Sequence, residues 1–179
     1  MSGLPASGKS RLGAAIAPLL GLALLDKDDF LETLFERDGT GDAAWRERLS
    51  RRSDDLFRSE AMAVALATGG AVLTSFWRHP ARVDGGGTPS DWLRTLPGPL
   101  VEVHCRCPAE IALERFRCRE RHPGHLDAKR READLSGKFD GYAARGLLGL
   151  GTVIAVDTSG SPDARALAAR IRSVIESGA

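Results

Sequence analysis

The sequence predicts an α/β fold in which a parallel sheet is flanked by helices in three layers. Two observations support this prediction. A glycine-rich segment near the N-terminus leads directly into helical periodicity, and short apolar runs then alternate with further helical stretches. The chain has 179 residues, 42% of them hydrophobic and 27% charged, which is enough for one domain with a substantial core. We therefore expect a single domain over residues 1–179.

The glycine-rich segment fits the pattern G-x-x-x-x-G-K-[ST], known as Walker A or the P-loop; its residues are Gly3, Leu4, Pro5, Ala6, Ser7, Gly8, Lys9 and Ser10. Its glycines let the backbone turn tightly and bring N–H groups and a helix N-terminus close to an anion. In this pattern Lys9 reaches the β- and γ-phosphates of a nucleoside triphosphate, and the Ser10 hydroxyl ligates Mg²⁺. The other interpretation is a glycine-rich turn that only caps a helix.

One element is missing around this loop. A P-loop follows a buried hydrophobic strand at the centre of the sheet, whereas only Met1 and Ser2 precede Gly3. Either the protein begins upstream of Met1, or the fold stands without its central strand. We favour the first interpretation, because a gap in a parallel sheet leaves two rows of backbone groups unpaired.

In the first half of the chain, periodicity predicts helices over 11–20, 30–37 and 43–67 and buried strands over 22–25 and 71–74. The acidic run 26–29 follows the first of these strands, at the edge of an open α/β sheet where ligands bind. Asp28 or Asp29 is also expected to cap the next helix. The run can equally be interpreted as caps and surface charge alone.

The long helix over 43–67 has candidate core positions at Trp45, Leu49, Leu56, Ala63 and Leu66. The arginines at positions 46, 48, 51 and 52 alternate with acids, and we expect them to form a solvated face.

In the second half, strands are predicted over 100–105 and 152–156, and helices over 90–96, 108–120 and 163–175. Another helix, before the last strand, is predicted to end at about residue 144. Residues 84–89, with three consecutive glycines, are predicted to be flexible surface.

The charge balance and the cysteine content exclude several classes of protein. The net charge is +1, so no global field attracts nucleic acid or a membrane surface, and no apolar run approaches the length of a membrane span. Three cysteines without a signal peptide indicate a reducing, cytoplasmic environment. The oligomeric state stays open.

Six arginines fall within 115–131, at positions 115, 117, 119, 121, 130 and 131, and the segment His-Pro-Gly-His at 122–125 interrupts the helix there. An arginine-rich helix end followed by a Pro-Gly break is typical of a mobile lid that closes on phosphates, so we expect a lid at about 117–131. A basic helix in solvent is the alternative. The two histidines have no third ligand nearby, and no metal site is expected there.

Together these segments resemble the small bacterial P-loop kinases that are often called AAA-family ATPases. This group is related to polynucleotide kinases, zeta toxins, chloramphenicol phosphotransferase and gluconate kinase. The likeness is carried by residues 3–10, 26–30, 72–76, 101–105, 121–127 and 156–158. It implies a parallel sheet of five strands, a lid, and phosphoryl transfer from Mg·ATP to a hydroxyl. In relatives an Asp after the second strand deprotonates that hydroxyl, and Asp28 is the most similar position, with Asp29 second.

The resemblance also implies roles for the arginines. The lid pattern Arg-x-x-x-Arg is similar to that of adenylate kinase-like lids and maps onto Arg115, near the adenine or α-phosphate, and Arg119, on the transferring phosphates. Arg121 is a substitute for either arginine. Arg11 and Asp157, the latter in a segment that looks like the loop flanking the adenine, complete the nucleotide-binding set.

Two positions depart from the pattern of the relatives. Thr74 stands where their third strand usually ends in an acid that holds a water on Mg²⁺; a hydroxyl can bond that water but adds no charge. Leu31 stands where polynucleotide kinases tend to have an arginine, which argues against a nucleic-acid acceptor.

The sequence thus predicts an ATP- and Mg²⁺-dependent kinase that phosphorylates a hydroxyl of a small molecule. Its catalytic residues are expected to be Lys9, Asp28 and Arg119, with Ser10 as metal ligand. Three alternatives remain: a nucleic-acid or nucleotide-sugar kinase of the toxin or end-repair type, an ATP-binding ATPase module without an acceptor, and an N-terminally truncated, inactive copy.

Overall fold

The computed structural model describes residues 1–81, 86–127 and 132–178 and, for residues 132–134, the backbone alone. Within these residues the elements follow in the order β1 (Ser2–Gly3), α1 (Lys9–Leu20), β2 (Ala23–Asp26), α2 (Lys27–Asp38), α3 (Ala43–Thr68), β3 (Ala71–Thr74), the 3₁₀ turn η1 (Asp91–Thr95), β4 (Val101–Arg106), α4 (Ala109–Cys118), the 3₁₀ turn η2 (Pro123–His125), α5 (Glu132–Ala143), β5 (Thr152–Asp157) and α6 (Ala164–Glu176). Each helix described is too short or too polar to span a bilayer.

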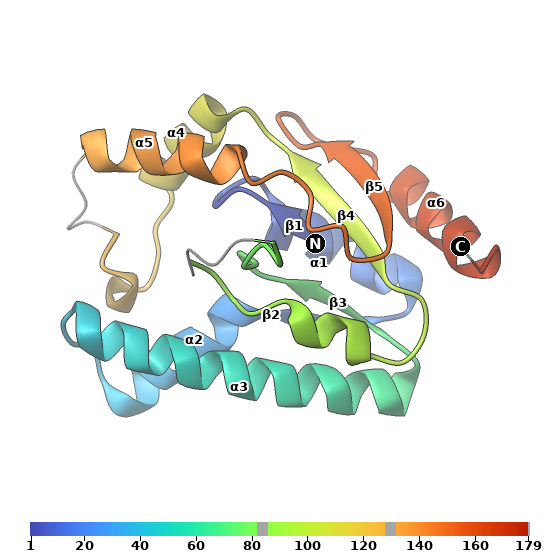
Figure 1. Cartoon of the computed structure of the whole chain (residues 1–179), viewed down its shortest axis with the longest axis horizontal. Helices are drawn as coiled ribbons and strands as arrows, with labels where there is room; N and C mark the ends of the chain where they lie inside the picture. The colour runs from blue at the N-terminus through green and yellow to red at the C-terminus, as the bar shows by residue number, and fades with distance from the viewer. Residues whose placement is uncertain (82–85, 128–131, 179) are drawn as a thin grey trace.

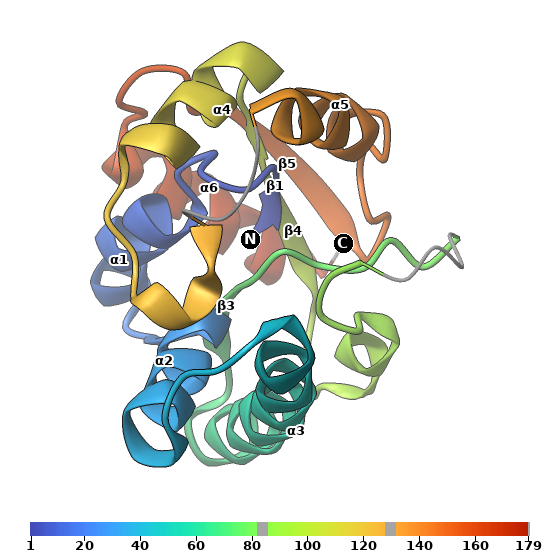
Figure 2. The ribbon, with the colours of Figure 1, turned by 90° about the vertical axis from the view of Figure 1, so that its left-hand side faces the viewer.

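The strands pair in parallel throughout. β2 pairs with β3, and β4 pairs with β1 on one side and β5 on the other. The Met1 amino group links the two ladders by donating a hydrogen bond of 2.7 Å to the Leu73 carbonyl oxygen on β3. The strands therefore lie in the spatial order β2-β3-β1-β4-β5, with helices on both faces (Figure 1 and Figure 2). This is the predicted three-layer α/β arrangement.

The central strand is present but contains only Ser2 and Gly3. A cavity of about 440 Å³ lies next to Met1 and Ser2, between residues of β3 and β4. Leu22, Leu100 and other apolar side chains form its wall. Burial lowers the pKa of the Met1 amino group to about 6. The central strand, which the sequence predicts to be missing, is thus reduced to two residues, but these residues occupy the central position of the sheet.

Two apolar clusters hold the layers together, one on each face of the sheet. The cluster under α1 and α6 consists of Leu12, Ile16, Ala17, Val72, Val103, Cys105, Ile154, Leu167 and Ile171. The cluster under α3 and η1 consists of Phe57, Ala61, Leu73, Trp77, Trp92, Leu93 and Leu150. Val72 and Leu73 enter opposite clusters because successive side chains of a strand point to opposite faces.

The buried stripe of α3 differs from the predicted one. It falls at every fourth position, on Leu49, Ser53, Phe57, Ala61 and Ala65. The predicted core positions Leu56 and Leu66 are 43% and 69% exposed, and Ala63 is also exposed. Ser53 hides the apolar pattern in the sequence, yet its hydroxyl donates to the Ser50 carbonyl oxygen at 2.7 Å, so its burial leaves no unpaired group.

The cap of α2 also differs from the expectation. The helix begins at Lys27, and Asp26 is its N-cap, accepting a hydrogen bond of 3.0 Å from the Asp28 amide. Neither Asp28 nor Asp29 is the cap. Because Asp26 caps the helix, the Asp28 side chain in the first turn can interact with other residues.

The glycine-rich segment predicted to be flexible is ordered where it is described, at residues 86–89; residues 84 and 85 lie outside the described residues. Thr88 is buried, and its amide and carbonyl bond the backbones of Phe76 and Arg78 at 2.8 and 2.7 Å. A Cβ on Gly87 would lie 2.5 Å from the Phe76 carbonyl oxygen. The glycine is needed for this close approach.

Phe57→Ala should lower the free energy of unfolding by about 3–5 kcal/mol, because the surrounding aromatic rings cannot fill the cavity it leaves. Phe57 is 0% exposed and packs against Phe30, Trp77 and Trp92. Urea unfolding followed by tryptophan fluorescence measures the change. The matched control Leu56→Ala should cost about 1 kcal/mol or less, and equal losses in the two variants would contradict the assigned stripe.

Candidate active site

The P-loop turns between the end of β1 and the start of α1. Gly3 has φ of +128°, and a Cβ there would lie 2.6 Å from the Cys105 carbonyl oxygen, so only glycine fits. Gly8, the N-cap of α1, is left-handed with φ of 91°. Loop residues 5, 6 and 8–11 line a cleft of about 610 Å³ that opens at this helix start. The loop therefore presents its backbone to the cleft as an anion-binding turn does.

Lys9 lies folded over its own loop. Its ammonium donates to the carbonyl oxygens of Gly3 at 3.1 Å and Leu4 at 2.6 Å. The side chain is buried, and burial lowers the pKa of Lys9 to about 8. The lysine that the sequence predicts to bind phosphate thus lies at the loop. Burial makes its positive charge less stable, and a bound anion would stabilise that charge.

The residues around the loop fit a magnesium nucleotide. Among the described residues, the buried hydroxyls of Ser7 and Thr74 have no hydrogen-bond partner, and such groups mark places for water or a polar ligand. Thr74 is the register partner of Asp26 at the ends of β3 and β2, and Asp26 lines the cleft together with Ser10. Hydroxyl and carboxylate oxygens are the ligands that Mg²⁺ takes directly or through water. Asp26 supplies the negative charge that Thr74 lacks.

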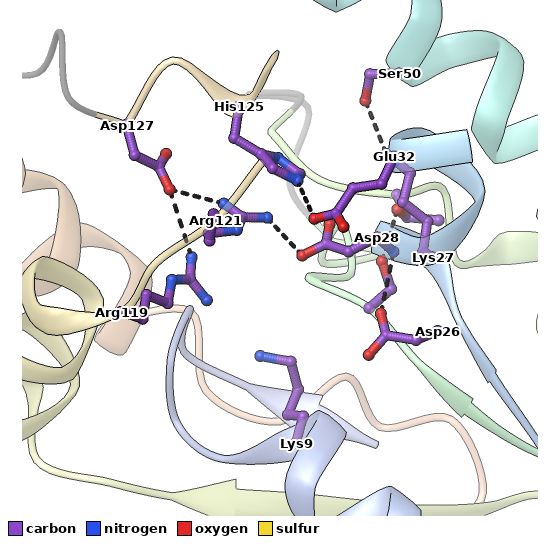
Figure 3. A network of polar contacts seen from close by, with 12 residues as sticks. Lys9, Asp26, Lys27, Asp28, Glu32, Ser50, Arg119, Arg121, His125 and Asp127 are labelled. Carbon is purple, nitrogen blue, oxygen red and sulfur yellow. Dashed lines mark hydrogen bonds and ion pairs between the residues drawn. The ribbon is translucent and has the colours of Figure 1, made fainter. Parts of the chain in front are cut away.

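Asp28 lines the same cleft as Lys9 and is held by an arginine from the segment after α4 (Figure 3). Arg121 donates to Asp28 Oδ2 at 2.5 Å and to Asp127 Oδ2 at 3.0 Å. Partial burial favours the neutral acid, but neighbouring positive charge, above all that of Arg121, outweighs it and lowers the pKa of Asp28. The carboxylate is therefore ionised at neutral pH, and Arg121, named in the sequence only as a substitute, is the arginine that contacts it.

The His-Pro-Gly-His segment packs on α2 through Phe35. The Phe35 ring stacks on His122 with centroids 5.2 Å apart and meets His125 edge-on at 5.4 Å. A Cβ on Gly124 would lie 2.5 Å from the same ring, so glycine is required between the two histidines. This part of the predicted lid is anchored, whereas residues 128–131 of that lid lie outside the described residues.

A second contact fixes the same segment. His125 Nε2 bonds Glu32 Oε1 at 2.9 Å, and the nitrogen must be the donor because a carboxylate only accepts. The imidazole is buried, which lowers the pKa of His125 and favours the neutral ring. Within the described residues no group of three metal-ligating side chains is found. Through their contacts with Phe35 and Glu32, the two histidines hold this segment, and with it Arg121, against α2.

The two predicted nucleotide arginines line the cleft from α4 and its end. Arg115 donates to the carbonyl oxygens of Thr158 at 2.7 Å and Ser159 at 2.5 Å, and so fixes the loop after β5. The Arg119 guanidinium lies 4.5 Å from the centroid of the Phe116 ring and 3.9 Å from Asp127 Oδ2. These contacts fix the orientation of both guanidinium groups at the edge of the cleft.

Asp157 is not among the residues that line this cleft. It accepts hydrogen bonds from the amide and hydroxyl of Ser159, at 2.8 and 2.6 Å, which lower its pKa. Its side chain lines a second cavity, of about 500 Å³, together with Phe76, Tyr142 and Arg145. The structure does not bring Asp157 to the cleft that holds Lys9, and its part in nucleotide binding stays a prediction.

A polar network that the sequence analysis missed forms another wall of the cleft. Lys27 donates to the Ser50 hydroxyl at 2.8 Å and lies 3.6 Å from Asp54. Asp54 in turn accepts from Thr88 at 3.0 Å, and Thr88 accepts from Ser75 at 2.7 Å. Burial lowers the pKa of Lys27 and raises that of Asp54, and each charge partly offsets the other's shift. No local pattern predicts this network, because it joins α2, α3 and two parts of the segment after β3.

The fold and the loop define a P-loop protein of the kinase-like type. Residues 1–136 match the family described as AAA domain, and the chain belongs to this family. Among proteins of curated function, none matches the chain.

Solved structures of kinases share the fold. A presumed kinase from Chloroflexus aurantiacus J-10-fl is 26% identical with a TM-score of 0.70, over 99% of this chain and 96% of that one. A sugar kinase from Janibacter sp. HTCC2649 is 21% identical with a TM-score of 0.57, over 99% and 92%. Shikimate kinase from Acinetobacter baumannii, solved with shikimate, is 20% identical with a TM-score of 0.53, over 98% and 91%. The last two matches concern the fold alone.

Arg121→Gln should raise the pKa of Asp28, because burial then acts against the carboxylate without the neighbouring guanidinium. A pH titration of the Asp28 carboxyl ¹³C resonance measures it. The control Arg170→Gln removes an exposed arginine on α6 and should leave the pKa unchanged. The same Asp28 pKa in wild type and Arg121→Gln would show that the contact does not set this charge.

Proposed function

We propose that the protein is a kinase that transfers the γ-phosphoryl group of Mg·ATP to a hydroxyl group of a small molecule. The observation that carries the proposal is that Lys9 and Asp28 line one cleft at the carboxyl edge of the parallel sheet. Edges of this kind are where open α/β sheets bind ligands. The likeness to the presumed kinase from Chloroflexus aurantiacus, at 26% identity over nearly the whole chain, supports the reaction class.

In this proposal the phosphate end of the site is built from the P-loop. The loop amides and Lys9 hold the β- and γ-phosphates, and Ser10 ligates the metal, with Asp26 and Thr74 beside it. When bound, Mg·ATP would supply the phosphoryl group, and its metal ion would balance the negative charge that develops on ADP. Arg119 neutralises charge on the transferring group, while Arg115, Arg11 and the loop after β5 hold the rest of the nucleotide.

Asp28 is proposed to accept the proton of the acceptor hydroxyl. Arg121 contacts its Oδ2 atom, so the carboxylate is fixed in orientation while Oδ1 is offered to the hydroxyl. Positioning of this kind is the larger part of kinase catalysis, since the phosphoryl transfer itself needs little covalent help from the protein.

A nucleic-acid acceptor is disfavoured by Leu31, which is 1% exposed and packs with Leu34, Phe35 and Leu49. The place where polynucleotide kinases tend to carry an arginine is therefore core in this protein. The remaining alternatives are a nucleotide-sugar kinase, an ATPase without an acceptor and an inactive copy, and experiment separates them from the proposal.

The first experiment combines two measurements on the whole chain. Thermal unfolding with Mg·ATP tests binding, because a ligand at about 100 times its dissociation constant adds roughly 2.7 kcal/mol to stability. ADP release is then measured with and without hydroxylated small molecules. Release that a particular acceptor accelerates, with formation of its phosphate ester, supports the kinase. Release that every acceptor leaves unchanged would favour the ATPase, and no Mg-dependent stabilisation would reject nucleotide binding.

Asp28→Asn should reduce phosphoryl transfer by about 10²–10⁴-fold while Mg·ATP affinity stays within a few-fold, because the amide cannot take the hydroxyl proton. Rates of ADP formation under saturating acceptor measure it. Asp29→Asn is the matched control, since Asp29 is exposed and is not among the cleft-lining residues. Transfer at the wild-type rate in Asp28→Asn would remove this residue from the proposed role.

The affinity for Mg·ATP should fall as pH rises above about 8. The pKa of Lys9 is about 8 in the free protein, and bound phosphate favours its protonated form, so ligand binding must take up a proton above that pH. The loss approaches tenfold per pH unit until the pKa of the bound state is reached. Calorimetric titrations at constant ionic strength measure it. Lys9→Arg, which stays charged, should flatten the profile; a flat wild-type profile would contradict the shifted pKa.

A further inference from the structure

Asp127 joins two arginines of the proposed active site through a single oxygen atom. Its Oδ2 atom accepts a hydrogen bond of 3.0 Å from Arg121 and lies 3.9 Å from the guanidinium of Arg119. Arg121 in turn donates to the Asp28 carboxylate at 2.5 Å. The four side chains form one line of contacts between α2 and the segment after α4, in the order Asp28, Arg121, Asp127 and Arg119 (Figure 3).

The two arginines serve opposite ends of the proposed site. Arg119 acts on the phosphates of the nucleotide, and Arg121 holds Asp28, the residue that receives the acceptor hydroxyl. Both arginines line the cleft, whereas Asp127 is not among its lining residues. A part for Asp127 in the reaction therefore runs through the two guanidinium groups, which makes it a positioning residue and not a catalytic one.

The backbone before Asp127 adopts an unfavourable conformation. Leu126 has φ of +60°, in the left-handed region that residues other than glycine seldom adopt. Its amide donates to the Pro123 carbonyl oxygen at 3.0 Å and closes a turn, and the contacts of the two histidines with α2 anchor the start of that turn. Such a conformation persists where surrounding contacts impose it, and the ion pairs of Asp127 are among those contacts.

We propose that Asp127 couples the nucleotide end of the active site to the acceptor end. The inference rests on the proposed function. Without nucleotide, Asp127 shares its negative charge between Arg119 and Arg121. When the phosphates draw Arg119 away, the same oxygen attracts Arg121 alone, and the hold of Arg121 on Asp28 loosens. Binding of the nucleotide thereby releases Asp28 toward the acceptor hydroxyl.

The first test follows the arginine Nε–H resonances of the whole chain by ¹⁵N NMR. The ligand is Mg²⁺ with adenylyl imidodiphosphate, a non-hydrolysable analogue of ATP. The resonances of Arg119 and Arg121 should change together, with the same midpoint. Asp127→Asn should keep the change at Arg119 and lose the change at Arg121, because the shared anion is gone. Asp127→Glu, which keeps the negative charge, should retain both changes.

The second test measures the affinity for the same analogue by calorimetry. In the wild type Arg119 leaves a carboxylate when it meets the phosphates, so Asp127→Asn should bind about twofold to fivefold more tightly, the range for one partly exposed ion pair. Loss of a residue that only supports the fold would weaken binding instead.

Asp38→Asn is the matched control for both tests. Asp38 is also a carboxylate shared by two arginines, Arg37 and Arg52, at 2.7 and 2.9 Å, but these three residues are not among those that line the cleft. The control should leave the affinity and the resonances of Arg119 and Arg121 as they are in the wild type.

Arg119→Gln tests the coupling without any change at Asp127, so the test also holds where Asp127→Asn fails to fold. In this variant the Arg121 resonance should differ from that of the wild type before any ligand is added, and the analogue should then leave it unchanged.

Three results would overturn the inference while leaving the kinase proposal standing: a wild-type Arg119 resonance that changes without that of Arg121, an Arg121 response that survives in Asp127→Asn or Arg119→Gln, or binding to Asp127→Asn that is no tighter than to the wild type. An analogue that changes no resonance and produces no heat of binding in the wild type would instead reject the proposed function, and the inference with it.

Discussion

The parallel pairing of β1 with β4 is the constraint on which the rest of the structure depends. Gly3 lets the two backbones approach so closely that no Cβ fits, and the Met1 amino group ties the same strand to β3. The loop that follows is thereby placed between the two ladders of the sheet. Close packing continues in α1, where a Cβ on Gly13 would lie 2.9 Å from Thr74. A strand of two residues thus fixes the point at which the loop leaves the sheet.

Charged side chains in the cleft next to this loop orient one another through shared ion pairs and hydrogen bonds. Arg121 divides its guanidinium between Asp28 and Asp127, and Lys27 shares Asp54 with Thr88. In a cleft that partly excludes water, such groups interact more strongly than they would on an open surface. The helices around the cleft contribute rigidity, and the polar contacts among α2, α3 and the segment after β3 contribute orientation.

The fold was predictable because its signals are local. The P-loop is a contiguous motif, and the strands coincide with apolar runs such as the one at β3. The site was predictable only in part. Arg121 meets Asp28 across 93 positions of sequence, and the burial of Thr88 depends on its pairing with Phe76 and Arg78. Ser53 concealed the buried stripe of α3 because burial of a serine depends on a local hydrogen bond. These features arise from tertiary pairing, which periodicity does not encode.

Under the proposed function, the hydrogen bonds that Lys9 makes to its own loop would restrict which anions the loop binds. Its ammonium already donates to two carbonyl oxygens of the loop, so an incoming anion must offer more than those bonds to draw it away. A lone orthophosphate engages few loop amides and gains little by the exchange. A polyphosphate chain would contact several loop amides and the ammonium together. Under the proposed function, such a loop would favour a long, highly charged phosphate chain over a single phosphate, before any contact with a base or a sugar.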